Sequence, residues 1–127
     1  MTEEDALRAY ARMMNCLDSS HLEPWLVDDF RYASQWVFDE IGSKAEYLEY
    51  IRPKLETIRQ AGAAPWAEIG WLADRPCVVM AQGDRDNLLA VVLAEVASGK
   101  ILRIDLCAVP APQAARRTGE YPGRVDA

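Results

Sequence analysis

The chain has 127 residues, 50% of them hydrophobic and 27% charged, which fits one ordinary globular domain and is too short for two. Its formal net charge is −6 and its longest basic run is the pair Arg116-Arg117, so the sequence offers no basic patch for nucleic acid. Acidic residues follow Met1, and no apolar run approaches the ~20 residues that a membrane span needs. We therefore expect no contact with a membrane and a cytoplasmic location.

The cysteine and histidine content argues against a metal or redox centre. Cys16, Cys77 and Cys107 are odd in number, lack C-x-x-C spacing and lie in apolar segments, so we expect reduced, buried thiols. His21 is the only histidine, and no patterned set of carboxylates accompanies it, so no metal site is expected. There is also no glycine-rich phosphate loop. We expect no cofactor.

The N-terminal segment has the pattern of an amphipathic helix over residues 3 to 17. Thr2 is in place to cap it, and three acidic residues follow, where they complement the helix dipole. Ser20 and Glu23 then have the spacing of a capping box, but Pro24 limits the following helix to a turn or two. The apolar stripe of the first helix consists of Leu7, Tyr10, Ala11, Met14 and Leu17.

Residues 28 to 38, DDFRYASQWVF, are predicted to form a strand with an aromatic face. Side chains alternate along a strand, so every second residue shares a face. The opposite face would carry Arg31, Ala33, Gln35 and Val37. The aromatic face, a candidate wall of a ligand pocket, consists of Phe30, Tyr32, Ser34, Trp36 and Phe38.

A second long helix is predicted between Ser43, which forms a capping box with Glu46, and Gly62, a natural C-terminal cap. Pro53 lies in its middle. Because an interior proline removes a hydrogen bond at a cost of ~3 kcal/mol, we expect a kink there or two shorter helices.

Four apolar strands follow, at residues 66 to 73, 77 to 82, 88 to 96 and 100 to 109, and their short connections predict antiparallel hairpins. The third of these strands, LLAVVLAEV, barely alternates, so both of its faces should be buried. Helices in a domain this small can cover only one face of the sheet. We therefore expect a second copy of the chain on the other face, as a homodimer joined through the sheet.

The order of these elements predicts an α+β fold in which a curved antiparallel sheet wraps around the N-terminal helices. Residues 1–109 would form this single domain. Residues 110–127 are rich in proline, arginine and glycine and are expected to be a mobile tail or an arm laid on the surface.

Three segments, VDDF after the short helix, the helix start GSKAEYLEYI and the last strand GKILRIDL, together with the order of elements, resemble the nuclear transport factor 2-like superfamily. Its relatives include ketosteroid isomerase and SnoaL-like cyclases. The resemblance covers about residues 3 to 109. It implies a cystatin-like, cone-shaped α+β barrel, a homodimer, and an apolar pocket between sheet and helices.

The same resemblance tests two known activities. Alignment with ketosteroid isomerase places Tyr10 at the tyrosine of the oxyanion hole but Ser34 at the carboxylate base, and a serine hydroxyl cannot abstract a carbon-bound proton near neutral pH. The Asp-Arg-Asp set of limonene-epoxide hydrolase would use Arg103 and Asp105. Its last aspartate falls on Leu106, which faces the other way. Neither mechanism is expected.

The residues expected to line a pocket are Tyr10, Met14, Tyr32, Ser34 and Trp36. The leading hypothesis is a protein that binds a small, largely apolar molecule there. One alternative is a non-catalytic dimerisation or interaction module whose pocket is filled by its own side chains. Another is a cofactor-free isomerase, cyclase or lyase of SnoaL-like type, with Tyr10 as hydrogen-bond donor and Asp105 as acid or base, although Arg103 and Asp105 also suit an ion pair. Whether the protein is an enzyme stays open.

Overall fold

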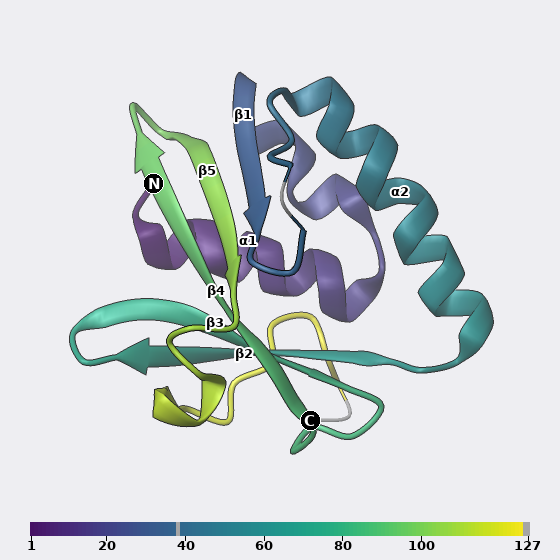
Figure 1. The fold of residues 1–127 in the computed structure, drawn as a ribbon, viewed down its shortest axis with the longest axis vertical. Helices are drawn as coiled ribbons and strands as arrows, with labels where there is room; N and C mark the ends of the chain where they lie inside the picture. The colour runs from purple at the N-terminus through teal and green to yellow at the C-terminus, as the bar shows by residue number, and fades with distance from the viewer. Residues whose placement is uncertain (38, 126–127) are drawn as a thin grey trace.

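The structure, a computed structural model, describes residues 1–37 and 39–125 (Figure 1). Two long helices and a curved six-stranded sheet account for most of these residues, with three short 3₁₀ helices between them. The helices are α1 (Glu3–Cys16), η1 (Ser19–His21), η2 (Glu23–Trp25), α2 (Lys44–Ala61) and η3 (Pro112–Ala114). The strands are β1 (Leu26–Ser34), β2 (Pro65–Leu72), β3 (Arg75–Gln82), β4 (Leu88–Ala97), β5 (Lys100–Cys107) and β6 (Arg116–Arg117).

Helix α1 begins and ends as its sequence predicts. The backbone N–H of Asp5 donates to Thr2 Oγ1 at 3.1 Å and the Asp5 carboxylate accepts from the Thr2 N–H at 2.9 Å, which is a complete capping box. Leu17 closes the helix in the left-handed conformation with φ 54°. Helix α1 lies with one face against the sheet, and the buried residues of that face are Ala6, Leu7, Tyr10, Ala11, Met13 and Met14.

Helix α2 is continuous from Lys44 to Ala61, so the expectation of two shorter helices was wrong. Ser43 Oγ accepts from the Glu46 N–H at 3.1 Å, and Gly62 ends the helix with φ 70°. Pro53 lies on the exposed side of the helix, where water can solvate the backbone carbonyl that loses its partner.

Strand β1 is displaced from its predicted position, because it begins at Leu26 and ends at Ser34. Residues 35 to 37 turn away from the strand, and the Trp36 N–H donates to Ser34 Oγ at 3.3 Å. The Gln35 side chain accepts from two backbone N–H groups of the segment after β5, at 2.7 and 2.8 Å. These side-chain bonds to the backbone end the strand although the aromatic alternation continues. Phe38 lies outside the described residues.

The sheet has the strand order β1-β5-β4-β3-β2-β6. Strands β2 to β5 form the predicted antiparallel hairpins, but β1 runs parallel to β5, with Tyr32 opposite Ile104 and Ser34 opposite Leu106. The sheet is therefore mixed and open, where an antiparallel one was expected. A parallel pair needs a long connection, and here everything from α2 to β4 lies between the two strands.

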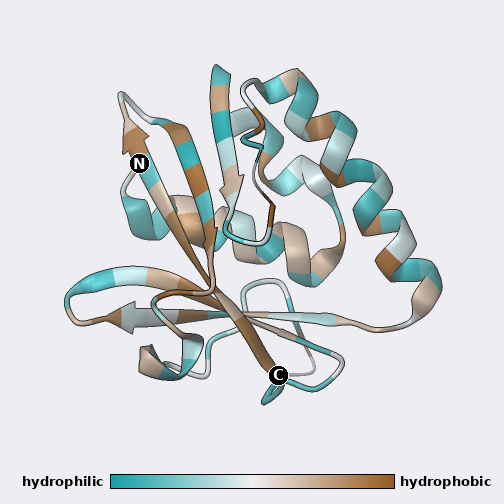
Figure 2. Ribbon diagram, in the orientation of Figure 1, coloured by the Kyte–Doolittle hydropathy of each residue, from teal (hydrophilic) through white to brown (hydrophobic). Residues whose placement is uncertain are grey.

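Both helices lie on the inner face of the sheet, with α1 against β2, β3 and β4 and α2 against β1 (Figure 1). Strand β4 is coloured as hydrophobic along most of its length (Figure 2). The consecutive β4 residues Val91 and Val92 are both fully buried. Val92 lies in the core under the helices, and Val91 lies on the outer face. The prediction that β4 is buried on both faces is confirmed.

Residues 110–125, which we call the C-terminal arm, provide the cover on the outer face. Ala115 packs on the outer apolar cluster that includes Val91, η3 contacts β4, and β6 pairs with β2. The carboxylate of Glu68, only 3% exposed, accepts from Arg117 Nε at 2.7 Å, the Gly119 N–H at 2.7 Å and the Tyr121 hydroxyl at 3.2 Å. The chain itself therefore covers the part of the outer face for which a second copy was expected. Among the helices described, none has the length and apolar character needed to cross a membrane.

Candidate functional site

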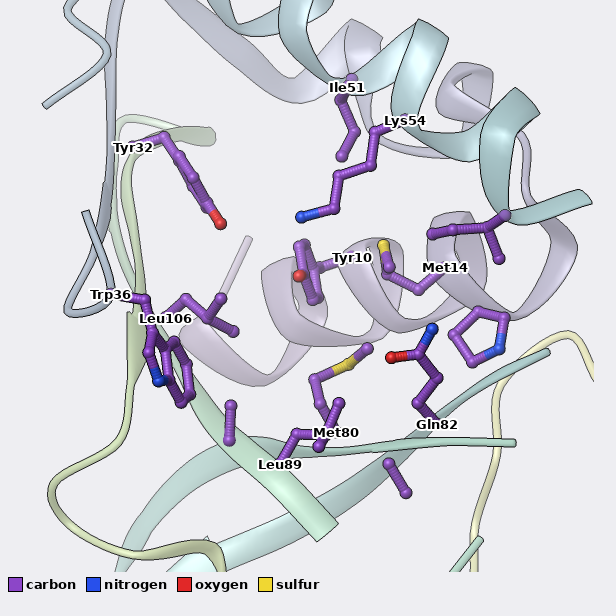
Figure 3. Close-up of a pocket in the computed structure, with 14 residues that line it drawn as sticks. Tyr10, Met14, Tyr32, Trp36, Ile51, Lys54, Met80, Gln82, Leu89 and Leu106 are labelled. Carbon is purple, nitrogen blue, oxygen red and sulfur yellow. The ribbon is translucent and has the colours of Figure 1, made fainter. Parts of the chain in front are cut away.

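A cavity of about 440 Å³ lies between the inner face of the sheet and the two long helices (Figure 3). Every layer of the fold contributes to its wall. The lining residues come from α1 (Tyr10, Met14), β1 and the turn after it (Tyr32, Trp36), α2 (Ile51, Lys54, Ile58), β2 and β3 (Pro65, Met80, Ala81, Gln82), and β4 and β5 (Leu89, Ala90, Leu106).

Four of the residues expected to line a pocket, Tyr10, Met14, Tyr32 and Trp36, lie on the wall of this cavity. Ser34 does not. It lines a shallow depression on the outer face of the sheet, and its Oγ accepts from the Trp36 N–H. Ser34 is the last residue of β1, and its hydroxyl is engaged with the Trp36 N–H at the strand end, whereas Trp36 reaches the cavity from the turn that follows. Alternation along one longer strand was therefore the wrong basis for grouping Ser34 with Tyr32 and Trp36.

Lys54 and Gln82 are polar lining residues that the sequence analysis missed. Lys54 lies three residues after Ile51 and four before Ile58, and all three side chains line the cavity. A lysine at helical spacing between two apolar residues of one stripe was the available signal. Gln82 ends β3 next to a loop, and nothing in its surroundings in the sequence marks it out.

Three polar groups of the cavity lie together on one side of it, apart from the Gln82 amide and the Trp36 indole (Figure 3). In Figure 3 the hydroxyls of Tyr10 and Tyr32 and the ammonium of Lys54 point into the same space. Lys54 Nζ donates to the Tyr50 hydroxyl at 2.8 Å and lies 5.2 Å from the centre of that ring. Burial raises the pKa of Tyr10 well above its usual value, and burial with the nearby Tyr10 and Tyr50 does the same for the pKa of Tyr32. Both phenols are therefore neutral hydrogen-bond donors near pH 7.

An aromatic cluster holds the β1 side of the cavity in place. Tyr47, fully buried on α2, has its ring centre 5.1 Å from that of Phe30 and 5.2 Å from that of Tyr32. Tyr50 follows at 5.7 Å from Tyr32. The Tyr47 hydroxyl finds no hydrogen-bond partner in the part of the chain that the structure describes. The rings thus fix Tyr32 by packing.

Asp105, the expected acid or base, lies on the opposite face of the sheet from Tyr10. It lines the outer depression with Ser34 and Leu106, and of these three residues only Leu106 also reaches the wall of the cavity. Arg103 Nε donates to both Asp105 oxygens at 3.0 Å, and Arg103 also pairs with Glu40. The hydrogen bond to Asp105 is the main reason that the pKa of Arg103 is raised. The structure does not bring Tyr10 and Asp105 together, and it supports the ion pair.

The three thiols are reduced, and none lines the cavity. Cys77 and Cys107 are buried as expected, whereas Cys16 is only partly buried. Burial raises the pKa of Cys77 to about 11, so the thiol is protonated near pH 7. Residues 1–37 and 39–125 contain no group of histidine, cysteine and carboxylate side chains that could hold a metal ion.

No model of a known protein family matches the sequence, and no curated protein matches it. Solved structures do match. An NTF2-like protein of unknown function from Cytophaga hutchinsonii is 10% identical with a TM-score of 0.58, over 87% of this chain and 94% of that one. The chain has the nuclear transport factor 2-like fold.

Two further structures show the range of proteins with this NTF2-like fold. A SnoaL-like protein of unknown function from Burkholderia thailandensis is 13% identical with a TM-score of 0.60, over 89% of this chain and 91% of that one. A putative ketosteroid isomerase from Kribbella flavida is 22% identical with a TM-score of 0.59, over 82% and 76%. Identities this low establish the fold and leave the activity to the residues of the site.

Proposed function

We propose that this NTF2-like protein binds a small, largely apolar molecule in the cavity between its sheet and its helices. The observation that carries the proposal is the cavity itself. Its volume of about 440 Å³ lies within the roughly 300–1,000 Å³ of sites that bury a small molecule. Apolar side chains form most of the wall, and a few polar groups converge on one side, which is the usual composition of such a site.

The size of the cavity favours binding over a pocket filled by the protein's own side chains. Protein interiors are close-packed, and voids much larger than a water molecule are few. Met14, Met80 and Leu106 reach the wall of this cavity without closing it. An assembly module with a filled pocket would have no use for such a space.

The lining also favours binding over catalysis. None of the described residues on the wall is an aspartate, glutamate or histidine, the side chains that most often take a proton from carbon near pH 7. Tyr10 is a buried donor of the kind that stabilises a developing oxyanion, and this keeps a cofactor-free isomerase, cyclase or lyase as the second candidate. Lys54 is the ionisable side chain on the described wall, besides the two tyrosines, that such a reaction could use as acid or base.

Binding of the neutral fluorophore N-phenyl-1-naphthylamine tests the proposal, because its emission rises when it leaves water for an apolar site. We expect saturable binding to the wild-type protein. Leu89→Trp should weaken it at least about tenfold, since Leu89 lines the cavity and is 43% exposed, so a larger ring there obstructs entry while the fold tolerates it. Leu102→Trp is the matched control, on a residue 38% exposed and outside the cavity. Non-saturable emission, or equal effects of the two substitutions, would remove the proposal.

The homodimer through the sheet remains a prediction. The C-terminal arm covers only part of the outer face, and the depression lined by Leu93, Arg103 and Asp105 stays open beside it. We propose that a second copy would pack there, with polar as well as apolar contacts. Light scattering of the full chain at micromolar concentration decides between this dimer and a monomer.

A further inference from the structure

We propose that the ligand of the cavity is an apolar molecule with an anionic end, a carboxylate or a group of similar charge, which Lys54 binds together with the hydroxyls of Tyr10 and Tyr32. This inference rests on the proposed function and names the chemical class of the ligand. It does not depend on whether the ligand is aliphatic or aromatic.

The charge of the lining is the first observation behind it. Lys54 is the only basic or acidic residue on the described wall. Every other lining residue is apolar or carries a neutral phenol, indole or amide. The chain as a whole has a net charge of −6, so an isolated cation at its cavity is a local departure from the overall charge. A neutral apolar ligand would leave that cation without a counter-charge, and an apolar cation would be repelled by it.

The bonding of Lys54 is the second observation. Its ammonium group has three donors and uses one on the Tyr50 hydroxyl at 2.8 Å. No carboxylate of residues 1–37 or 39–125 forms an ion pair with it, although Glu40, Glu56 and Glu120 each pair with an arginine elsewhere on the surface. The bond to Tyr50 holds the amine at the cavity and leaves two N–H groups to donate.

The third observation is the position of the two phenols. The hydroxyls of Tyr10 and Tyr32 point into the space that Lys54 Nζ faces (Figure 3). Tyr10 is 4% exposed and Tyr32 is 5% exposed, and the Tyr32 hydroxyl also shares a hydrogen bond with Tyr50. The Lys54 ammonium and the Tyr10 hydroxyl are thus the donors beside a space that no carboxylate of the described wall lines, and an anionic oxygen of the ligand, within reach of Tyr32 as well, completes that set.

A competition experiment separates this inference from the proposed function. N-phenyl-1-naphthylamine, which carries no charge, serves as the reporter, and decanoate and decan-1-ol compete for it as a pair of equal chain length. Transfer out of water alone favours the alcohol over the carboxylate. We expect the opposite order in the wild-type protein, with decanoate displacing the reporter at a concentration on the order of tenfold lower. This factor is at the lower end of the range for a hydrogen bond to a charged group, because Lys54 is exposed to solvent.

Substitutions of Lys54 then assign the effect. Lys54→Met should abolish the advantage of decanoate over decan-1-ol, with both compounds measured against that variant's own affinity for the reporter, and Lys54→Arg should keep most of the advantage. Lys44→Met is the control, because it removes the same charge from the same helix at a residue outside the cavity. Displacement of a bound reporter by both compounds at equal concentrations, or an advantage that survives Lys54→Met, would overturn the anionic ligand. In those two cases the apolar site would stand, whereas a reporter that fails to bind the wild-type protein would remove the site itself.

Discussion

The two faces of the sheet bury apolar side chains in different ways. On the inner face the helices pack over Val92 and its neighbours but leave a cavity of about 440 Å³ beside Tyr10. On the outer face the C-terminal arm lies directly on Val79 and Val91, with an apolar residue of the arm in contact. Burial alone therefore does not distinguish a face that is sealed from one that keeps room for a ligand.

The polar groups of the two faces also differ in whether the protein itself satisfies their hydrogen bonds. Glu68 on the outer side has three donors from the arm, all within 3.2 Å, and forms a closed set of partners. Lys54 on the inner side is held at a phenol and faces open space. A satisfied buried network stabilises one structure, whereas donors directed into a cavity are suited to recognition. We interpret the arm as structural and the cavity as functional.

The largest effect is expected from removing the guanidinium of Arg117, which binds Glu68 on the outer face. Arg117→Met should lower the free energy of unfolding by about 2 to 3 kcal/mol, because the Glu68 carboxylate would stay buried with fewer donors. Urea denaturation measures the change. Arg116→Met, at the exposed neighbouring residue of β6, should change it by less than about 0.5 kcal/mol. A loss as large in the control would mean that Arg117 contributes through the strand and not through Glu68.

The same variant should open the outer face to reagents while leaving the cavity intact. Cys77 is buried in the outer cluster and its pKa is raised to about 11, so alkylation of the wild-type protein at pH 8 should be slow. Release of the arm in Arg117→Met should speed alkylation of Cys77, as peptide mass spectrometry would show. Binding of the neutral reporter at the inner cavity should stay unchanged. Loss of binding would show that the two faces are coupled.

The inner and outer faces of the sheet also differ in how far the sequence predicts them. Periodicity located α1, α2 and the hairpins from β2 to β5, and the lack of alternation in β4 predicted burial on both of its faces, because these signals depend only on which residues avoid water. It assigned the outer face to a second copy of the chain, and it offered an arm laid on the surface as one of two alternatives for residues 110–127 without placing that arm on this face. The pattern of apolar residues in the arm is sparse, and its attachment depends on the pairing of Glu68 with Arg117, which are 49 positions apart.

The site shows a similar limit at shorter range. Tyr10 and Tyr32 were expected on the cavity wall because aromatic residues on inward faces are visible in the sequence. Ser34 was misplaced because it ends β1 and its hydroxyl accepts from the Trp36 N–H, a local side-chain bond to the backbone that strand alternation does not predict. Lys54 was missed because a lysine on a helix is usually solvated. That its side chain lines a cavity depends on how α2 packs beside the sheet, which the local sequence does not show.

A substitution beside the cavity should have an effect of the opposite sign to that of Arg117→Met. The Tyr47 hydroxyl is fully buried without a partner among the described residues, so Tyr47→Phe removes an unsatisfied polar group and keeps the ring packed on Phe30 and Tyr32. We expect the free energy of unfolding to rise by about 1 kcal/mol in thermal or urea denaturation. Tyr121→Phe, which removes a hydroxyl bonded to Glu68, is the contrasting control and should lower stability. A destabilised Tyr47→Phe protein would show that a water molecule satisfies that hydroxyl.

The smallest effect is expected at the contact between the arm and α1, and it depends on pH. Glu120 of the arm accepts from Arg8 Nη2 at 3.0 Å. This hydrogen bond is the main reason that the pKa of Glu120 lies below its usual value, and it outweighs the effect of burial, which raises the pKa. The contribution to stability is therefore complete above the unfolded pKa of about 4.3 and is lost as the pH falls through the lower folded pKa. Because the Glu120 side chain is 50% exposed, we expect the ion pair to contribute less than about 1 kcal/mol to the free energy of unfolding.

Glu120→Gln should consequently lower stability at pH 7. The difference from the wild-type protein should disappear as the pH falls through the lowered folded pKa of Glu120, below which the glutamic acid and the glutamine are both uncharged. Urea denaturation at a series of pH values measures the two curves. Glu49→Gln, at an exposed residue of α2 far from the arm in sequence, should run parallel to the wild-type curve through the acid range. If the Glu120→Gln curve also ran parallel to that of the wild-type protein, the pairing with Arg8 would contribute nothing to stability. The arm would then depend on Glu68 and its apolar contacts alone.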